Sequence, residues 1–402
     1  MDTILIIGTI LSLGFLFGQI LWKLGFPKVT GYILAGIVLS PTFSGIISTN
    51  FPAHTDPIVN IALSVIAFSV GGMLSYSRIK KLGKQIIYIT ICESEFAFIA
   101  VALAFLVVTF NDPNMSMVFI PLSLLIASLA APTDPSATLA VVHEYEAKGE
   151  VTSTIMGITA LDDVMGIINY SIAVILAEII MGHNPLNLTS LLLKPFSIIS
   201  GSILLGIFFG LIFNLVSFII KKETEGVLIV LIISLISLCA GIASTLGVER
   251  LLTIVTMGAV VANFNKMHYK IFMILERYTE ELVFVIFFTL SGMHLNFTIL
   301  VGSILFVAVF VISRAVGKTI GVVVGATLSS ASKKVRKYTV GGLIPQGGIV
   351  VGLALAMRQY PLFAPFIDTI ISVVIGAVVV HEIIGPILSE ATLKRAKEIS
   401  VV

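Results

Sequence analysis

Apolar runs of helix length recur along the whole chain and are separated by short polar breaks. Reading the runs between the breaks gives about thirteen segments, each long enough or nearly long enough for a transmembrane helix. They begin near Thr3, Gly31, Pro57, Gln85, Ser116, Val151, Phe196, Gly226, Val248, Thr279, Ile299, Tyr338 and Ala364. The runs are too continuous for barrel strands, and only helices or closed barrels satisfy the backbone inside lipid. The pattern predicts an all-α polytopic membrane protein.

Composition and charge placement support this prediction. Hydrophobic residues make up 57% of the chain and charged residues 11%, which excludes an ordinary soluble domain. Lys and Arg concentrate in cytoplasmic loops. With the N-terminus outside and the C-terminus cytoplasmic, nineteen of the 24 basic residues fall on the inside. We therefore expect a multi-pass protein of the plasma membrane, in contact with the lipid bilayer and with no nucleic-acid partner.

The two ends of the chain and the two cysteines do not change the functional prediction. The first segment has no basic residue before it and no small-residue cleavage site after it, so we expect a retained helix rather than a signal peptide. Only a short basic tail follows Ile387, and we expect no soluble regulatory domain there. Cys92 and Cys239 lie in predicted spans with no pairing signature, so no disulfide is expected.

Two spans are interrupted at corresponding places. The fifth span carries the first break and the twelfth span, seven spans later, carries the second. The first break contains Pro132 and Pro135, and the second contains Pro345, Gln346, Gly347 and Gly348. Proline removes a backbone donor and glycine loosens a helix, so each span is expected to unwind. This spacing favours an inverted-repeat transporter with two crossing unwound helices over two ordinary proline kinks.

Asp162 and Asp163 lie about eleven residues into the sixth predicted span. One carboxylate at that depth costs at least about 2.5 kcal/mol on insertion scales. Burial and mutual repulsion both favour the protonated form, so such a group can hold either a proton or a cation. Successive helix residues point about 100° apart, and the two aspartates should therefore play different roles.

Arg314 and Lys318 are the cations inside the predicted spans, and they lie one turn apart on one helix face. Buried charges are normally paired, so we expect one aspartate to hold Lys318 until a cation or protons displace it. The alternative is a static buried ion pair. Thr133 and Asp134 belong to the first break, where Asp134 could neutralise a helix end or serve only as a cap.

Four further polar residues lie in predicted spans. Glu93 and Glu95 lie near the cytoplasmic end of the fourth span, where either could pair with Arg314 or stay solvated. His381 and Glu382 lie in the last span. For the histidines, ordinary surface positions are favoured over a pH-sensing role.

Several motifs, in order along nearly the whole chain, resemble the cation:proton antiporters of the Kef-like and bacterial Na+/H+ antiporter type. The most specific is Leu161-Asp162-Asp163, which is similar to the paired-aspartate motif of that family. The others are Leu24 to Pro27 with Gly31 to Gly36 and Pro41, Thr133 to Thr138, Phe287-Phe288 with Gly292-Met293, Arg314 with Gly317-Lys318, Leu343 to Gly348, and Gly385-Pro386 with Lys394 to Ala396.

The resemblance implies roles for the site residues. Asp163 would bind the transported Na+ or proton, Asp162 would pair with Lys318, and Thr133 and Asp134 would complete the crossing. It also implies a homodimer, with no cofactor and no enzymatic activity. The implied division is scaffold and dimerisation helices at 1–84 and 226–296, moving core helices at 85–181 and 299–390, a linker helix at 196–222, and a cytoplasmic tail at 391–402.

The chain also departs from the family pattern. Met73 stands near a position where many relatives carry an acidic residue, and the nucleotide-binding domain of Kef-type channels has no counterpart here. We therefore expect antiport of Na+, with Li+ as a further substrate, against H+ by alternating access. K+/H+ antiport is the nearest alternative, and selectivity depends on cavity details that a sequence does not reveal. Two other classes are an organic-anion carrier and an intramembrane aspartyl protease, which would need its aspartates on different helices.

Overall fold

The computed structural model describes residues 3–24, 28–41, 43–44, 47, 55–110, 119–134, 138, 141–142, 145, 147–159, 161–182, 188–219, 224–293 and 297–399. Every regular element in these ranges is a helix. The chain is a multi-pass, all-helical protein, as predicted. Pro135 lies outside the described residues.

The first half of the chain supplies α1 (Thr3–Lys23), α2 (Lys28–Leu39), α4 (Asp56–Met73), α5 (Tyr76–Phe110), α6 (Phe119–Ser128), α8 (Glu150–Thr159) and α9 (Asp162–Met181). The middle supplies α10 (Leu188–Ile219), α11 (Glu225–Leu246), α12 (Arg250–Phe264), α13 (His268–Ile274), η2 (Leu275–Glu280) and α14 (Glu281–Met293). The last part supplies α15 (Phe297–Gly302), α16 (Ile304–Leu328), α17 (Lys333–Tyr338), η3 (Thr339–Leu343), α18 (Gly348–Ala356), η4 (Met357–Gln359), η5 (Pro361–Phe363) and α19 (Ile367–Arg395).

Within the described ranges, seven helical segments are long and apolar enough to cross a membrane, and six shorter apolar helices have 10–17 residues. These helices follow the order of the predicted segments. The shorter ones include α6 and α18, which adjoin the two predicted breaks. The number of crossings itself stays a prediction.

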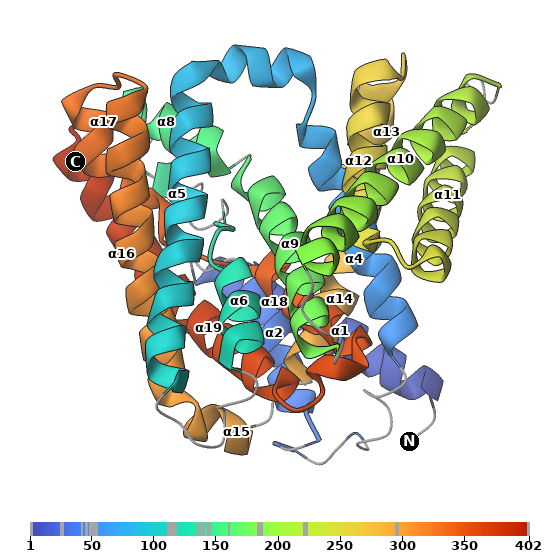
Figure 1. The fold of residues 1–402 in the computed structure, drawn as a ribbon, viewed down its shortest axis with the longest axis horizontal. Coiled ribbons are helices and arrows are strands. Elements are labelled where there is room, and N and C mark those ends of the chain that lie inside the picture. The colour runs from blue at the N-terminus through green and yellow to red at the C-terminus, as the bar shows by residue number, and fades with distance from the viewer. Residues whose placement is uncertain are drawn as a thin grey trace.

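The structure agrees with the predicted start of the fourth segment and divides the sixth. The helix α5 has an apolar span that begins at Gly83, near the predicted Gln85, and a shorter first part from Tyr76, and the two parts meet at Gly83, whose φ of +78° is not helical. Its first part therefore runs across the top of Figure 1 before α5 turns down through the molecule. The sixth segment is divided, because α8 ends at Thr159 and α9 begins at Asp162. No proline or glycine marks this third break.

The helices pack in two sets. On one side α5 lies along α16, with α6, α8, α9, α18 and α19 around them; we call these the core helices, as the resemblance implies. On the other side α2 packs between α1 and α14, and α4 packs on α12; with α11 we call these the scaffold helices. The linker helix α10 lies against α11 and α12. The division into a moving core and a fixed scaffold stays a prediction.

Glycines permit a close contact between α5 and α16. A Cβ atom at Gly317 would fall 2.5 Å from the carbonyl oxygen of Phe96, and one at Gly321 would fall 2.4 Å from the Cα of Glu93. Small residues let membrane helices approach closely. The contact brings Glu93 of α5 beside Lys318, which directly follows Gly317 and lies one turn before Gly321 on α16.

Candidate functional site

The paired aspartates begin a helix rather than occupying the middle of one. Asp162 and Asp163 are the first two residues of α9, where the positive end of the helix dipole favours carboxylates. Asp162 is completely buried, whereas Asp163 is partly accessible. Neither oxygen of Asp162, nor Oδ1 of Asp163, has a hydrogen-bond partner within the described part of the chain. The start of α9 therefore presents acceptor oxygens that a proton or a cation can occupy.

The two predicted breaks contact each other directly. α6 ends at Ser128 and η3 ends at Leu343, and the chain is not helical for several residues beyond each end. The backbone N–H of Asp134 donates to the carbonyl oxygen of Pro345 at 3.1 Å. The Thr133 hydroxyl lies 3.4 Å from the carbonyl oxygen of Leu343. The predicted crossing is therefore present in the structure.

Arg314 binds the crossing through backbone carbonyl groups. Its guanidinium donates to the carbonyl oxygens of Ala130 at 2.8 Å, Pro132 at 2.8 Å and Ile344 at 2.7 Å. Unwound segments leave carbonyl groups without helical partners, and one guanidinium has enough donors for several. Arg314 forms no ion pair with a described carboxylate, so neither Glu93 nor Glu95, which the sequence left open as partners, pairs with it in the structure. Its geometry holds both breaks together.

Gln346 and His381 extend this network. The Gln346 side chain donates to the carbonyl oxygen of Leu129 at 2.7 Å, and its oxygen lies 3.1 Å from Nδ1 of His381. His381 is 1% exposed, so a surface position is wrong for this histidine. Gly347 is equally constrained, because a Cβ there would fall 2.1 Å from Oδ2 of Asp134. These contacts fix the second break against the first.

Lys318 is shared among three oxygen-bearing side chains. Its Nζ lies 2.5 Å from Oε2 of Glu93, 2.9 Å from Oγ1 of Thr133 and 3.6 Å from Oδ2 of Asp162. Lys318, Glu93 and Asp162 are all completely buried. The aspartate expected to hold Lys318 is therefore its more distant partner. Sequence reasoning left Glu93 open, and the signal that could have placed it is the glycine spacing of α16 described above.

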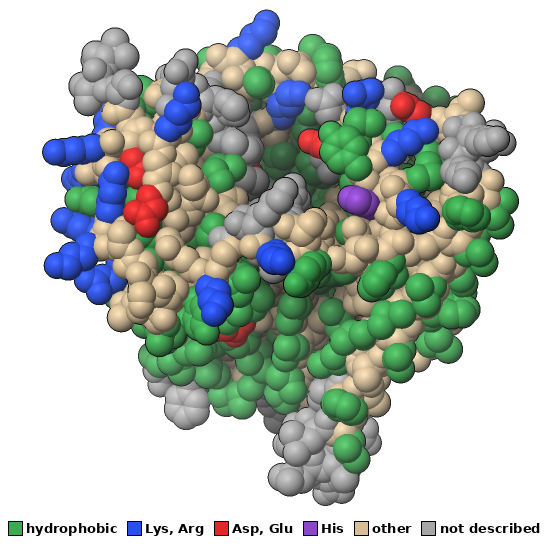
Figure 2. Space-filling model, turned by 90° about the horizontal axis from the view of Figure 1, so that it is seen from above, with side chains coloured by type: hydrophobic (Ala, Val, Ile, Leu, Met, Phe, Trp, Pro, Cys, Tyr) green, Lys and Arg blue, Asp and Glu red, His purple; other side chains and the backbone are tan. Residues whose placement is uncertain are grey.

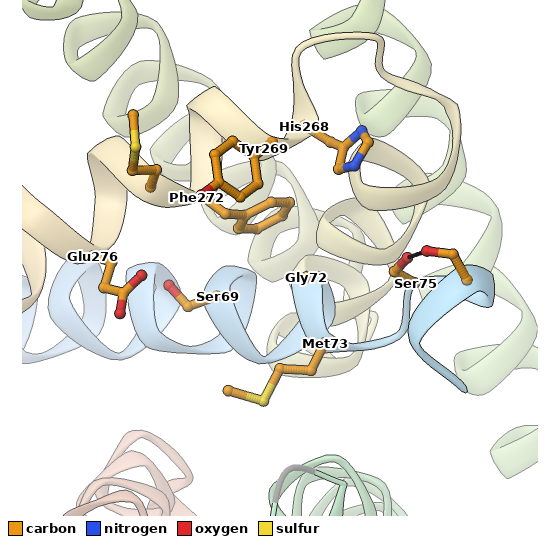
Figure 3. A pocket seen from close by; sticks show the side chains of 10 residues that line it. Ser69, Gly72, Met73, Ser75, His268, Tyr269, Phe272 and Glu276 are labelled. Atoms are coloured by element: carbon orange, nitrogen blue, oxygen red, sulfur yellow. Dashed lines mark hydrogen bonds between the residues drawn. The ribbon is translucent and has the colours of Figure 1, made fainter. Parts of the chain in front are cut away.

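A cavity of about 450 Å³ opens near the ends of α4 and α13. Figure 3 shows Ser69 and Gly72 on the side of α4 that faces Tyr269 and Phe272 of α13, with Glu276 beside Ser69, whereas the Met73 side chain points to the opposite side of α4. Figure 2 shows the molecule from above, with Lys and Arg side chains around a central hollow. Met73, noted as a departure from the family, lines this cavity.

A tightly held metal has no evident place in the described residues. No group of three or more His, Cys, Asp or Glu side chains in those ranges is arranged to hold a metal ion.

Comparisons with known proteins agree on one family. The family model described as "Sodium/hydrogen exchanger, transmembrane" matches residues 8–395. The Na(+)/H(+) antiporter NhaS4 of Synechocystis sp. is 26% identical over 91% of this chain and 92% of its own length. The ammonium/H(+) antiporter subunit AmhT of Alkalihalophilus pseudofirmus is 24% identical over 82% of this chain and 80% of its own. The solved structure of the sodium proton antiporter MjNhaP1 of Methanocaldococcus jannaschii is 17% identical and matches 98% of both chains with a TM-score of 0.75, which shows the same fold.

Proposed function

Since the chain belongs to the transmembrane sodium/hydrogen exchanger family, we propose that it exchanges Na+ for H+ by alternating access, with Asp163 as the site that both ions share. The observation that carries the proposal is the start of α9. There Asp163, a partly accessible residue, lies next to the buried Asp162. Three of their four carboxylate oxygens have no hydrogen-bond partner within the described ranges, and Oδ2 of Asp162 lies 3.6 Å from Nζ of Lys318. Such an acid takes a proton or a cation, but not both together.

The neighbouring residues support the cycle in defined ways. Arg314 holds the two breaks in register, so that the carbonyl groups of the crossing can face a bound ion. Glu93 neutralises Lys318, which leaves the Asp162 carboxylate held at 3.6 Å rather than in a tight ion pair. Asp162 then adds negative charge beside Asp163 without being locked to the lysine. Thr133 and Asp134 complete the polar lining.

The distribution of basic residues suggests the orientation of the chain, because Lys and Arg concentrate in cytoplasmic loops. We propose a plasma-membrane protein with its N-terminus outside. We propose that exposed apolar side chains of α1 and α10 contact lipid or the second subunit of a homodimer; examples are Phe15, Phe208 and Leu211.

The test is transport in proteoliposomes with a pH-sensitive dye enclosed, adding Na+, Li+, K+ and NH4+ in turn. We expect Na+ to drive proton movement in the intact protein and Asp163→Asn to abolish it. Proton movement that persists in Asp163→Asn would remove Asp163 from its role. A dye signal that does not change on addition of any of these cations would reject cation exchange as a whole.

K+ or NH4+ exchange is the second candidate. One relative carries ammonium in its name, and carboxylate and carbonyl oxygens bind Na+, K+ and NH4+ alike. The same assay separates these substrates. A response to K+ or NH4+ at concentrations where Na+ is inert would replace Na+ while leaving the role of Asp163 intact.

A further inference from the structure

Glu249 is a buried acid that lies away from the exchange site. It is 4% exposed and stands at the N-cap of α12, where its side chain accepts hydrogen bonds from the backbone N–H groups of Leu251 at 3.1 Å and Leu252 at 2.6 Å. The usual caps are the shorter side chains of Ser, Thr, Asp and Asn. The longer glutamate can cap the helix and still reach a partner on another helix.

That partner is Ser171 of α9. The buried Ser171 hydroxyl lies 2.9 Å from Oε2 of Glu249 and 2.8 Å from the carbonyl oxygen of Ile167, one turn earlier on the same helix. A hydroxyl has one hydrogen to donate, and hydrogen bonds to an ionised acceptor are stronger than those between neutral groups. We therefore assign Ser171 as the donor and Glu249 as the acceptor.

This hydrogen bond joins the core helices to the scaffold helices. Ser171 lies on the core helix α9, nine residues or about 14 Å after Asp162, whereas Glu249 caps the scaffold helix α12. The backbone N–H of Glu249 also donates to Oγ of Ser202 on the linker helix α10 at 2.9 Å. Glu249 thus connects all three parts of the fold.

Two other contacts join core to scaffold on the same side of the molecule. The Gln359 side chain of η4, which follows α18, donates to Oδ1 of Asn60 near the start of α4. A Cβ atom at Gly352 of α18 would fall 2.5 Å from Cζ of Phe287 on α14 and 3.0 Å from Cδ1 of Leu63 on α4. The proposed orientation places the starts of α4 and α12 and the connection after α18 on the outside. In this structure α9 and α18, the outward-directed halves of their interrupted spans, are therefore packed against the scaffold.

We propose that the hydrogen bond between Ser171 and Glu249 is a latch that holds the core closed against the scaffold on the outer side, with Glu249 as a positioning residue for the exchange. This latch rests on the proposed function, because alternating access requires α9 to move against α12 whenever the ion site opens outward. The bond must break in each such step. Its strength then helps to set the fraction of molecules that are open to the outside.

The test measures how fast a cysteine in the outer contact is labelled from outside. Leu63 is 2% exposed and packs against α18, so Leu63→Cys should react with a membrane-impermeant maleimide only when the outer side opens. The reagent is added to intact cells that make the full chain, with Cys92 and Cys239 replaced by alanine. Ser171→Ala removes the latch and leaves the cap of α12 in place. Because the closed state alone loses a hydrogen bond to a charged group, we expect labelling to become about tenfold faster.

Two matched variants separate the latch from a general loosening of the fold. Glu249→Gln keeps the shape of the side chain but weakens the acceptor, so its labelling should also be faster. Ser202→Ala removes another buried hydroxyl that contacts Glu249, but α10 lies along α12 and not across the boundary with the core. It should lower the melting temperature without faster labelling. The latch is rejected if Ser171→Ala or Glu249→Gln labels no faster than the parent chain, or if Ser202→Ala accelerates labelling as much as Ser171→Ala.

The dye assay separates failure of the latch from failure of the proposed function. A chain that exchanges cations for protons, but whose labelling does not respond to Ser171→Ala, loses only the latch. A chain whose labelling responds as expected, but that moves no protons with any cation, loses only the exchange.

Discussion

At the residue scale, the partners of the buried cations are the least predictable part of the site. The sequence placed Asp162, Arg314 and Lys318 in one buried cluster, because charges inside lipid need partners. It could not choose the partners, since Lys318 meets Glu93 only through the close approach of α5 and α16. It also could not foresee that Arg314 would bind backbone carbonyl groups instead of a carboxylate.

Glu93→Gln tests the pairing. Removing one partner of a buried ion pair leaves the other charge uncompensated, so we expect the free energy of unfolding to fall by about 3 kcal/mol. Lys318→Gln should cost a similar amount, and the double variant should cost less than the sum of the two. Denaturant unfolding in mild detergent measures all three.

Glu95→Gln is the matched control for these three variants. Glu95 lies on the same helix but is only partly buried, so its change should be smaller. Additive costs for Glu93→Gln and Lys318→Gln would show that the two side chains do not act as a pair.

At the scale of the helices, the sequence predicted the elements and two of the three breaks. Prolines and glycines in the fifth and twelfth segments predicted the crossing, because they weaken a helix locally. The break before Asp162 lacks both residue types. It depends on packing around the crossing, which leaves no local sequence signal, and on the preference of carboxylates for a helix N-terminus, a signal that Asp162 and Asp163 carry but that does not by itself predict a break inside a continuous apolar run.

Gly321→Ala tests the helix contact that positions Glu93. Its Cβ would fall 2.4 Å from the Cα of Glu93, so α16 must move away from α5, at a cost of about 1–3 kcal/mol. We also expect exchange activity to fall, because Lys318 moves with α16. Melting temperature and dye-reported transport are the measurements.

Gly241→Ala provides the comparison. Gly241 lies inside α11, and an added Cβ meets nothing within 4 Å. Alanine should therefore leave stability unchanged or raise it by up to about 1 kcal/mol. Equal losses from both substitutions would mean that the close approach of α5 and α16 is not what makes Gly321 sensitive.

At the scale of the whole molecule, the residues after α19 fold back onto the core. The Glu398 carboxylate accepts hydrogen bonds from the backbone N–H groups of Val151 at 3.0 Å and Thr152 at 2.8 Å, and it lies 3.0 Å from Nζ of Lys334. The sequence suggested only a basic cytoplasmic tail. The contact joins this tail to the start of α8, the helix that precedes the paired aspartates.

The Glu398 contact predicts a dependence of stability on pH. Burial alone would raise the pKa of Glu398, but the hydrogen bonds from Thr152 and Val151 and the contact with Lys334 outweigh it, so its pKa lies below the ordinary value of 4.5. A lowered folded-state pKa gives stability that is present above pH 4.5 and lost as the pH falls through the folded-state value.

Melting temperatures of the intact chain and of Glu398→Gln, measured from neutral to acid pH, check this dependence. The intact chain should be the more stable at neutral pH, and the gap should close in acid. A gap that stays constant down to the acid limit would mean that the Glu398 charge does not contribute.

The bend of α5 at Gly83 has a mechanical consequence. The start of α5 is held by Asn263 of α12. The Asn263 side chain accepts a hydrogen bond from the N–H of Tyr76 at 2.7 Å and donates one to the carbonyl oxygen of Leu74 at 2.9 Å. The stretch from Tyr76 to Leu82 is a helical segment about 10 Å long, held by Asn263 at one end and joined through Gly83 to the rest of α5 at the other. In the alternating access proposed above, a displacement of the rest of α5 against α12 would therefore change the angle of this segment.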